Sequence, residues 1–300
     1  MDTRVHLMQN NARFGITLMI ATTVIFAAQD GISRHLGSAY NVQMIVMLRY
    51  WFFALFVLSV ARRVSGGIAR AAKTAHLGLQ ILRGIILAVE IWIAVLAFTL
   101  LGLIESHAVF ACYPLIIAAL SGPVLGEKVG WRRWSAIAVG FIGLLIILRP
   151  GVGVFSTLAL LPLLSAILFA IYGILNRYVA RNDRAETSFF WTGIVGAIVS
   201  TGMGIWYWEA MTGPDWIWMG LLCISGVSGH WLLIKSYEVA EASVLQPFAY
   251  LQLVFVAFIG LTVFGEELKS NVALGAMVVI GAGLFTLWRE KLKARSLQRL

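Results

Sequence analysis

The sequence has few cysteines and few charged residues. Its two cysteines, Cys112 and Cys223, both lie inside apolar runs, which argues against a disulfide framework and excludes a CxxC metal or redox motif. Charged residues make up 12% of the chain and hydrophobic residues 60%, whereas a soluble domain carries about 25% charged residues. A core of this size cannot bury so many apolar side chains. The composition therefore predicts a protein that crosses a lipid bilayer several times.

Motifs of common enzyme classes are missing too. The sequence holds no GxxxxGK[ST] loop for ATP hydrolysis, no GxSxG nucleophile motif and no HExxH zinc motif. His230 has no second histidine or cysteine at ligand spacing in its run. We therefore expect no enzyme activity, no metal site and no cofactor. An intramembrane enzyme acting on lipid or peptide is the alternative that these absences disfavour.

Ten apolar runs of the length that spans a bilayer follow one another with short breaks between them. Gly, Ala and Ser are frequent inside several runs, and such small residues let helices approach closely in lipid. The expected fold class is all-α integral membrane with ten transmembrane helices. The runs cover residues 14–33, 42–61, 75–99, 106–125, 131–148, 157–177, 187–208, 214–237, 242–264 and 271–288.

Basic residues are distributed unevenly among the breaks. With the N-terminus placed in the cytoplasm, 17 of the 23 lysines and arginines fall on the inner side and three on the outer side. Cytoplasmic loops of membrane proteins carry such an excess. The pattern predicts a multi-pass protein of a bacterial-type cytoplasmic (inner) membrane with both ends in the cytoplasm. Because these residues form no stripe with interleaved aromatic residues, we expect no nucleic-acid partner.

The two halves of the chain resemble each other. FAAQDGISRH (26–35) matches FAIYGILNRY (169–178) at an offset of 143, and Tyr113 matches Tyr250 at an offset of 137. Residues 1–150 and 151–300 then hold five runs each, and an odd number of spans inverts the second half relative to the first. The expected architecture is thus two inverted five-helix repeats. Such repeats are typical of carriers that alternate access around a central site.

Each half places a Gly-Glu pair after its fourth run. The two acids, Glu127 and Glu266, are 139 residues apart. They lie at the membrane edges and not at the midplane, where carriers bind substrate. We expect them to cap or tether the turns at which the fourth and ninth helices end.

The order and spacing of several short motifs resemble the ten-helix EamA-type exporters of the drug/metabolite transporter superfamily. The resemblance covers both halves and implies a secondary exporter with a central cavity between them. It also implies a small metabolite as cargo, notably an amino acid, without fixing the substrate. The motifs are D-x3-R-x14-RY (30–50), LRG (82–84), YPL (113–115), LGEKVGWRRW (125–134), GF-x-GLLIILRPG (140–151), SGH (228–230), SYEVAEAS (236–243) and FGEE (264–267).

Two titratable residues lie in the middle of apolar runs. A charge inside a bilayer costs about 3 kcal/mol or more, so such residues are candidates for function. Glu90 would bind a substrate ammonium group or carry a proton, or else it forms an interhelical hydrogen bond. His230 would line the cavity, or else it is a buried histidine with its partners satisfied.

Four further side chains are candidates for the cavity. Tyr113 and Tyr250 match under the repeat, and each lies beside a proline that frees a helical carbonyl group. Gln246 is one turn before Tyr250 on the same helix face. Trp92 lies deep in its run and would line the cavity. Core packing is the alternative for the two tyrosines.

Four charged residues are expected to have structural or gating roles. Asp30 and Arg34 lie one turn apart near the outer end of the first run, so we expect a local ion pair, with an outer gate as the alternative. Arg49 and Arg83 lie nearer the membrane edges, where they would pair or extend toward water.

These features together predict a secondary transporter that exports small amphipathic metabolites by alternating access. Neutral or aromatic amino acids, or a broader set of amino acids, are the expected cargo. The alternatives are export of other small metabolites or drugs and, at lower weight, a passive channel. The expected partners are the small-molecule substrate and the lipid bilayer, and we expect a monomer or a weak dimer.

Overall fold

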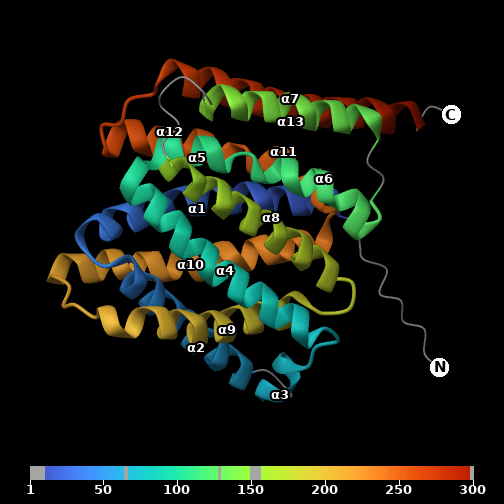
Figure 1. Cartoon of the computed structure of the whole chain (residues 1–300). Helices are drawn as coiled ribbons and strands as arrows, with labels where there is room; N and C mark the ends of the chain where they lie inside the picture. The colour runs from blue at the N-terminus through green and yellow to red at the C-terminus, as the bar shows by residue number, and fades with distance from the viewer. Residues whose placement is uncertain (1–10, 64–66, 128–129, 149–156, 298–300) are drawn as a thin grey trace, which may run out of the picture.

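The computed structural model describes residues 11–63, 67–127, 130–148 and 157–297, and every regular element in these ranges is helical (Figure 1). The first half holds α1 (Ala12–Ala39), α2 (Val42–Arg63), α3 (Gly67–Ala72), α4 (Leu77–Leu101), α5 (Leu103–Phe110), α6 (Tyr113–Leu125) and α7 (Trp131–Leu148). The second half holds α8 (Leu160–Val179), α9 (Ala185–Gly204), α10 (Gly213–Val239), α11 (Ala242–Ala249), α12 (Leu251–Val263) and α13 (Ser270–Leu297). Short 3-10 turns cover Thr157–Ala159 and Ile205–Tyr207.

The helices give the ten spans expected from the apolar runs. Eight segments of the described chain are long and apolar enough to cross a membrane, and two shorter apolar helices, Trp134–Ile147 and Ser270–Ala282, occupy the fifth and tenth positions. The helix α13 itself continues as far as Leu297. The all-α membrane fold is therefore confirmed.

The fourth and ninth spans are each made of two half-helices and not of one continuous helix. α5 ends at Phe110 and α6 begins at Tyr113, while α11 ends at Ala249 and α12 begins at Leu251. Pro114 at the start of α6 and Pro247 inside α11 explain the interruptions, because proline has no N–H group to continue the helical ladder. Both breaks lie in the interior of the bundle, where irregular backbone in a membrane protein must be shielded from lipid.

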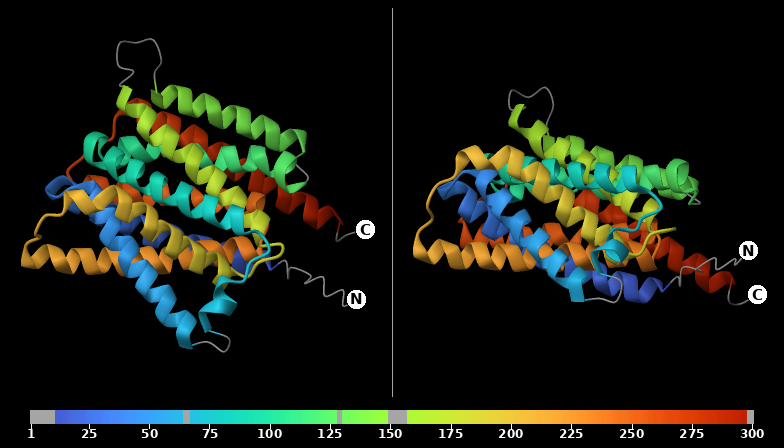
Figure 2. Two further views of the ribbon diagram at one scale, coloured as in Figure 1. Left: turned by 60° about the horizontal axis from the view of Figure 1, so that its bottom comes forward. Right: turned by 90° about the horizontal axis from the view of Figure 1, so that it is seen from below.

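The packing of the helices has a two-fold pattern. α1 packs against α10, and the corresponding helices of the other half, α8 and α4, pack against each other. α2 pairs with its counterpart α9, and α7 pairs with its counterpart α13 along one edge of the bundle (Figures 1 and 2). Exchanging the halves therefore reproduces the same set of neighbours, as an internal repeat requires. The predicted boundary between the halves, after residue 150, lies outside the described residues.

α1 begins and α13 ends at the same end of the bundle (Figure 1). An even number of spans requires this arrangement, whichever side of the membrane that end occupies. The inward placement of this end stays a prediction from the distribution of basic residues.

Candidate functional site

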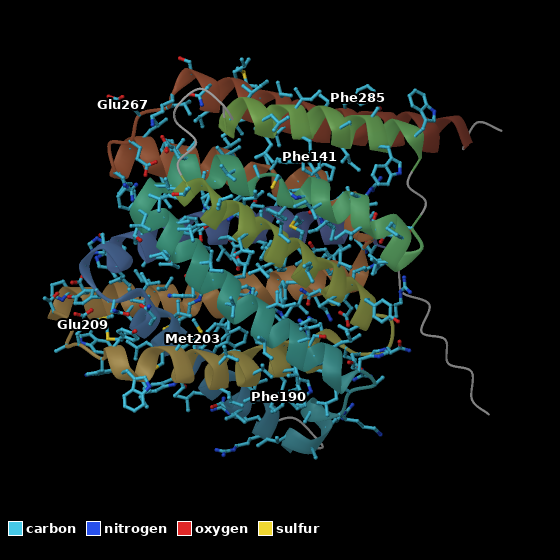
Figure 3. The ribbon with its side chains drawn as sticks, viewed as in Figure 1. Phe141, Phe190, Met203, Glu209, Glu267 and Phe285 are labelled. Atoms are coloured by element: carbon cyan, nitrogen blue, oxygen red, sulfur yellow. The ribbon has the colours of Figure 1, made fainter. Side chains whose placement is uncertain are left out.

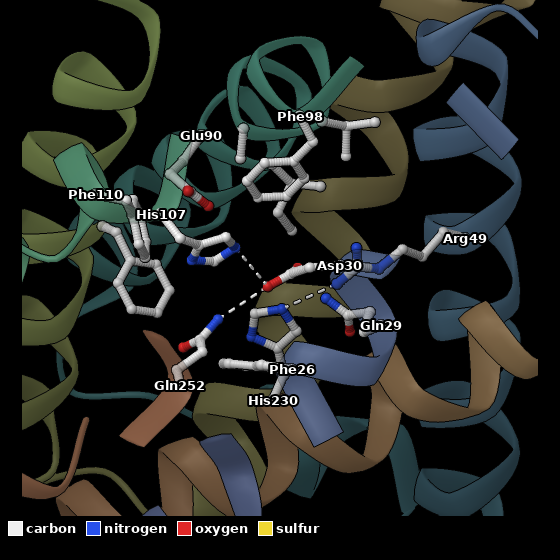
Figure 4. A pocket seen from close by; sticks show the side chains of 14 residues that line it. Phe26, Gln29, Asp30, Arg49, Glu90, Phe98, His107, Phe110, His230 and Gln252 are labelled. Atoms are coloured by element: carbon white, nitrogen blue, oxygen red, sulfur yellow. Dashed lines mark hydrogen bonds and ion pairs between the residues drawn. The ribbon is translucent and has the colours of Figure 1, made fainter. Parts of the chain in front are cut away.

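A small polar cavity lies in the middle of the bundle, between the two halves (Figure 4). Its volume is about 40 Å³, which is room for a few water molecules but not for a metabolite. In the structure the side chains around the site thus leave too little room for a metabolite. The side chains that line it come from α1, α2, α4, α5, α8, α10 and α12: Phe26, Gln29, Asp30, Arg49, Glu90, Ile91, Ala94, Val95, Phe98, His107, Phe110, Phe169, His230 and Gln252.

Asp30 is at the centre of this cavity. Its Oδ2 accepts a hydrogen bond from Nε2 of Gln252 at 2.9 Å, and Nε2 of His107 lies 3.1 Å from the same oxygen. The His107 contact is close without being aligned as a hydrogen bond, since His107 Nε2 has no hydrogen-bond partner among the described residues. A carboxylate from α1 is thus held by one side chain from α5 and one from α12.

The position of Asp30 corrects the expectation that it lies near the outer end of its helix. The apolar run ends near residue 33, but α1 continues as a helix to Ala39. Asp30 is therefore nine residues from the helix end, or about 13 Å at 1.5 Å per residue. The expected local ion pair with Arg34 is also wrong, because Arg34 pairs with Glu266.

Arg49 contributes the positive charge of the cavity. It is buried, with 4% of its surface exposed, and its Nη2 lies 3.3 Å from Nε2 of His230. Since a guanidinium group only donates, His230 Nε2 must accept, and the imidazole is then neutral with its proton on Nδ1. The expectation that Arg49 extends to the membrane edge is wrong: α2 begins at Val42, so Arg49 is two turns inside the helix.

Glu90 lines the cavity from α4, and it also forms an interhelical hydrogen bond. Its Oε1 accepts from the Ser165 hydroxyl of α8 at 2.6 Å, and its side chain is buried. The hydrogen bond matches one of the two alternatives that the sequence left open for Glu90, while binding of a substrate or a proton stays a prediction. Glu90 and His230 are 140 residues apart (230 minus 90), which is close to the offset of the repeat, so both central positions of α4 and α10 carry a titratable group.

The remaining walls are aromatic. The His107 ring stacks on Phe98 with centroids 4.9 Å apart, and the His230 ring lies 5.1 Å from that of Phe26. Phe110 and Phe169, whose centroids are 5.5 Å apart, form the opposite wall. The faces of such rings attract cations and stack on planar groups. The cavity therefore combines two carboxyl groups and one guanidinium group with apolar walls.

Four predicted cavity residues do not line this pocket. Tyr113 packs edge-on against Phe169 at 4.9 Å, and Tyr250 is buried at the break between α11 and α12. Gln246 donates to the hydroxyl of Tyr237 at 3.2 Å and to a backbone carbonyl of its own helix. Trp92 is half-buried, packed against the core.

Sequence reasoning missed His107, Gln252 and Gln29 as lining residues. Each is a polar side chain inside or next to an apolar run, and that is the signal that could have identified it. The fourth run begins at residue 106, so hydropathy alone places His107 at the start of its run. In the structure the fourth span begins at Leu103 and is interrupted after Phe110. His107 therefore lies next to this interruption, inside the bundle.

Arg83 belongs to a separate buried cluster. It donates hydrogen bonds to Gln80, Asn176 and Thr192, and its guanidinium group lies 5.2 Å from the centre of the Tyr172 ring. Arg83 is fully buried, so of the two alternatives left open by the sequence it finds partners and does not extend toward water. Its hydrogen bonds hold α4, α8 and α9 together.

Glu266 binds the other half of the protein. Its two carboxylate oxygens accept hydrogen bonds from the backbone N–H groups of Leu103 at 2.7 Å and Ile104 at 2.8 Å, and Arg34 donates to it as well. Gly102, which precedes α5, has no side chain to cap this helix. Glycine is favoured here because the φ angle is +86°. An added Cβ would also lie 2.8 Å from the Glu266 carboxylate. We call Glu266, Arg34 and the start of α5 the Glu266 clamp.

Glu127 makes the equivalent contacts in the opposite direction. Its Oε1 accepts from the backbone N–H of Ala242, the first residue of α11, at 3.3 Å, and it lies 3.8 Å from Nε of Arg177. We call Glu127, Arg177 and the start of α11 the Glu127 clamp. Each acid therefore follows the fourth span of its own half and caps the start of the fourth span of the other half. Sequence analysis expected such capping, but at the turn that carries the acid.

Comparison with known proteins agrees with this architecture. A profile described as the EamA-like transporter family matches residues 13–149 and 156–288. A solved crystal structure of 16% identity, which covers 91% of this chain and 96% of its own, has the same fold with a TM-score of 0.67.

Three curated relatives match along most of their length. The S-adenosylmethionine uptake transporter of Rickettsia prowazekii is 28% identical over 280 residues, covering 92% of this chain and 93% of its own. The riboflavin transporters of Vibrio cholerae and Brucella anthropi are each 26% identical, covering 94% and 93% of this chain and 95% and 100% of their own. These relatives are transporters and not enzymes. Because the family profile matches both halves, the chain belongs to the EamA-like transporter family, within the drug/metabolite transporter superfamily.

Proposed function

We propose that this protein is a secondary transporter that carries a small organic cation with a planar ring across the cytoplasmic membrane, by alternating access around the cavity at Asp30. S-adenosylmethionine, named for the Rickettsia relative, is the example of this class. The observation that carries the proposal is the charge of the cavity: the carboxyl groups of Asp30 and Glu90 face the single guanidinium group of Arg49.

The charges and walls of the cavity suit such a cargo. Asp30 and Arg49 balance one another, whereas Glu90 is buried with one hydrogen bond, so its ionised form needs a positive partner. A cargo with one positive charge would supply that partner. The phenyl rings of Phe26, Phe98 and Phe110 would contact a planar heterocycle or a cationic centre. An uncharged cargo would supply no partner for an ionised Glu90 and would leave that side chain as a neutral acid.

Alternating access is supported by the two clamps. The Glu266 clamp and the Glu127 clamp lie at opposite ends of the fourth and ninth spans, and each joins the two halves. We propose that the Glu266 clamp opens to admit cargo from outside and the Glu127 clamp to admit it from the cytoplasm. The sequence has no motif for ATP hydrolysis, so the direction of net transport would follow the gradients of the cargo and of any coupled ion.

Riboflavin is a second candidate cargo, because the relatives from Vibrio cholerae and Brucella anthropi carry that name. Amino acid export, which the resemblance in sequence implies, has no counterpart in the names of the relatives described above. An amino acid and S-adenosylmethionine nevertheless share the same ammonium and carboxylate end group. Both riboflavin and phenylalanine therefore belong in the test as competing cargoes.

Counterflow in proteoliposomes tests the proposal. Vesicles loaded with unlabelled S-adenosylmethionine should accumulate the labelled compound from outside in a saturable manner, which a passive channel would not do. S-adenosylhomocysteine, which lacks the methyl group and its positive charge, should compete at least about tenfold more weakly, because losing one charge pair at this depth is worth more than about 1.4 kcal/mol. Unlabelled riboflavin and phenylalanine should compete less than S-adenosylmethionine.

The variants Asp30→Asn and Glu90→Gln should each reduce counterflow at least about tenfold. Glu267→Gln, an exposed acid at the turn between α12 and α13 (Figure 3), is the matched control and should behave as the unmodified protein. Counterflow of riboflavin or phenylalanine without that of S-adenosylmethionine would refute the proposed cargo class. The absence of counterflow for every compound would refute the carrier itself.

A further inference from the structure

A second, much larger cavity opens on the outer surface of the bundle, between α2, α3, α9 and α10. Its volume is about 730 Å³, within the range of sites for small molecules. α2 diverges from the bundle toward α3 at this place (Figure 2). Its walls are almost wholly apolar and include Phe52, Phe56, Phe190, Ile224 and Trp231. We call this cavity the lateral groove.

The length of the lateral groove is close to the thickness of one leaflet of a membrane. Along α2 its lining extends from Phe52 to Ala61, which are nine residues apart, or about 14 Å. The hydrocarbon core of a bilayer is about 30 Å thick, so this length is about half of it. The rims of the groove, at Phe56 and Ile224, are 40% and 59% exposed, and these apolar surfaces would face lipid.

Basic residues lie at one end of the groove only. Arg70 of α3 and Arg184, just before α9, line that end, together with Glu186. The carboxylate of Glu186 lies 3.8 Å from Nζ of Lys235, which pairs more closely with Glu238. The two arginines still give this end of the groove an excess of one positive charge over Glu186. The distribution of basic residues places this end in the cytoplasm, where membranes expose anionic lipid headgroups. Figure 3 shows Phe190 next to this end, beside α3.

The groove is separate from the transport cavity, although the two are close. They share no lining residue. The wall between them contains Phe189, whose ring lies 5.2 Å from that of Trp231 in the groove and 4.6 Å from that of Phe53. Phe53 in turn lies 6.4 Å from the His230 ring of the transport cavity. An occupant of the groove would therefore pack against the side chains that support His230.

We propose that the lateral groove binds an anionic phospholipid from the cytoplasmic leaflet. One acyl chain lies along the apolar walls between α2 and α10, and the headgroup phosphate lies at Arg70 and Arg184. The length of the groove, its exposure to lipid and its single basic end all match an amphiphile with one anionic end. This site does not depend on which metabolite the central cavity carries.

Native mass spectrometry of the full-length protein in detergent tests the proposal. The protein is mixed with phosphatidylglycerol or with phosphatidylcholine of the same acyl chains, and the lipid-bound fraction is measured. We expect a preference of about tenfold for phosphatidylglycerol, since each basic residue near a headgroup contributes measurably to the binding of anionic lipid. The double variant Arg70→Gln/Arg184→Gln should bind both lipids equally.

Two further variants make the test specific. Arg13→Gln/Lys73→Gln removes two exposed basic residues that do not line the groove, and it should keep the preference. Ser228→Phe fills the groove from α10, and it should lower the binding of both lipids while the melting temperature in detergent stays within a few degrees.

Three results would overturn the proposal. The first is an unchanged preference in the Arg70→Gln/Arg184→Gln variant, and the second is unchanged lipid binding in Ser228→Phe. The third is a lipid-free dimer that Ser228→Phe dissociates, which would assign the groove to a second copy of the chain.

Discussion

Replacing Glu266 with glutamine should make the central cavity accessible from the outer side. The substitution keeps the size of the side chain but removes its charge and one of its two acceptor atoms. In the structure the two carboxylate oxygens receive three donors, from Leu103, Ile104 and Arg34. The amide oxygen of glutamine can accept from the donors that one carboxylate oxygen received. The NH₂ group then faces the remaining donor and cannot accept a hydrogen bond from it.

The size of the effect follows from these contacts. A part-buried N–H group left without an acceptor costs about 1–3 kcal/mol. The bond from Arg34 also loses its charge assistance, which adds to this cost because the side chains of Arg34 and Glu266 are only 21% and 13% exposed. The clamp is thus weakened by about 2 kcal/mol, which would raise the fraction of molecules open on the outer side roughly 30-fold.

A thiol placed in the cavity can report this opening. Ala94 lines the cavity and is 9% exposed, so Ala94→Cys introduces a small reporter. The native thiols are removed by Cys112→Ala and Cys223→Ala. A membrane-impermeant maleimide added outside right-side-out vesicles should label the reporter roughly 30-fold faster in the Glu266→Gln background, in proportion to the open fraction.

Two controls decide the interpretation. Glu127→Gln should leave labelling from outside unchanged and should accelerate labelling in inside-out vesicles. Glu267→Gln, which changes the neighbouring exposed acid, should change neither rate. The reasoning would be refuted if Glu266→Gln left the outer rate within about twofold of the parent, or if it accelerated labelling from the inner side instead.

Three further predictions concern the cavity and the packing. Asp30→Asn should reduce counterflow at least about tenfold with an unchanged melting temperature, because the change removes a charge from the cargo site; normal counterflow would exclude Asp30 from cargo binding. Gly196→Ala should cost about 1–3 kcal/mol of stability, because the added methyl group would lie 2.0 Å from a neighbouring tyrosine ring; Gly202→Ala on the same helix, with nothing within 4 Å, is the control for unfolding in detergent. Gly102→Ala should accelerate outer labelling as Glu266→Gln does, because its methyl group would meet the clamp carboxylate, whereas Gly126→Ala, also at positive φ but in open space, should not.

The transmembrane segments could be predicted from the sequence because they depend on composition alone. Their ends could not, since hydropathy reports where lipid ends and not where the helix ends. α1 continues through Arg34 and Ser38 as an ordinary helix, which moves Asp30 from the expected membrane edge into the cavity. α2 begins seven residues before Arg49, with the same result. The expected positions of these two residues were therefore wrong for a single physical reason.

The cavity itself depends on contacts between the halves. Glu90 and His230 could be recognised because each lies isolated in the middle of a run. Asp30, His107 and Gln252 form a group only when α1, α5 and α12 meet, and no spacing within one run encodes that meeting. The clamps are an intermediate case: the repeat indicated that Glu127 and Glu266 were equivalent, but not that each caps a helix of the opposite half.

This exchange of acids makes the two halves chemically incomplete as separate polypeptides. In a fragment that ends before α8, the backbone N–H groups at the first turn of α5 would lack their acceptor, Glu266. Glu127 of that fragment would in turn lack the start of α11, which it caps. Duplication and inversion of an ancestral bundle would thus produce, in one step, both the uncapped helix start and the acid that caps it. A gene divided between α7 and α8 should yield a working carrier only when both products are made in the same cell.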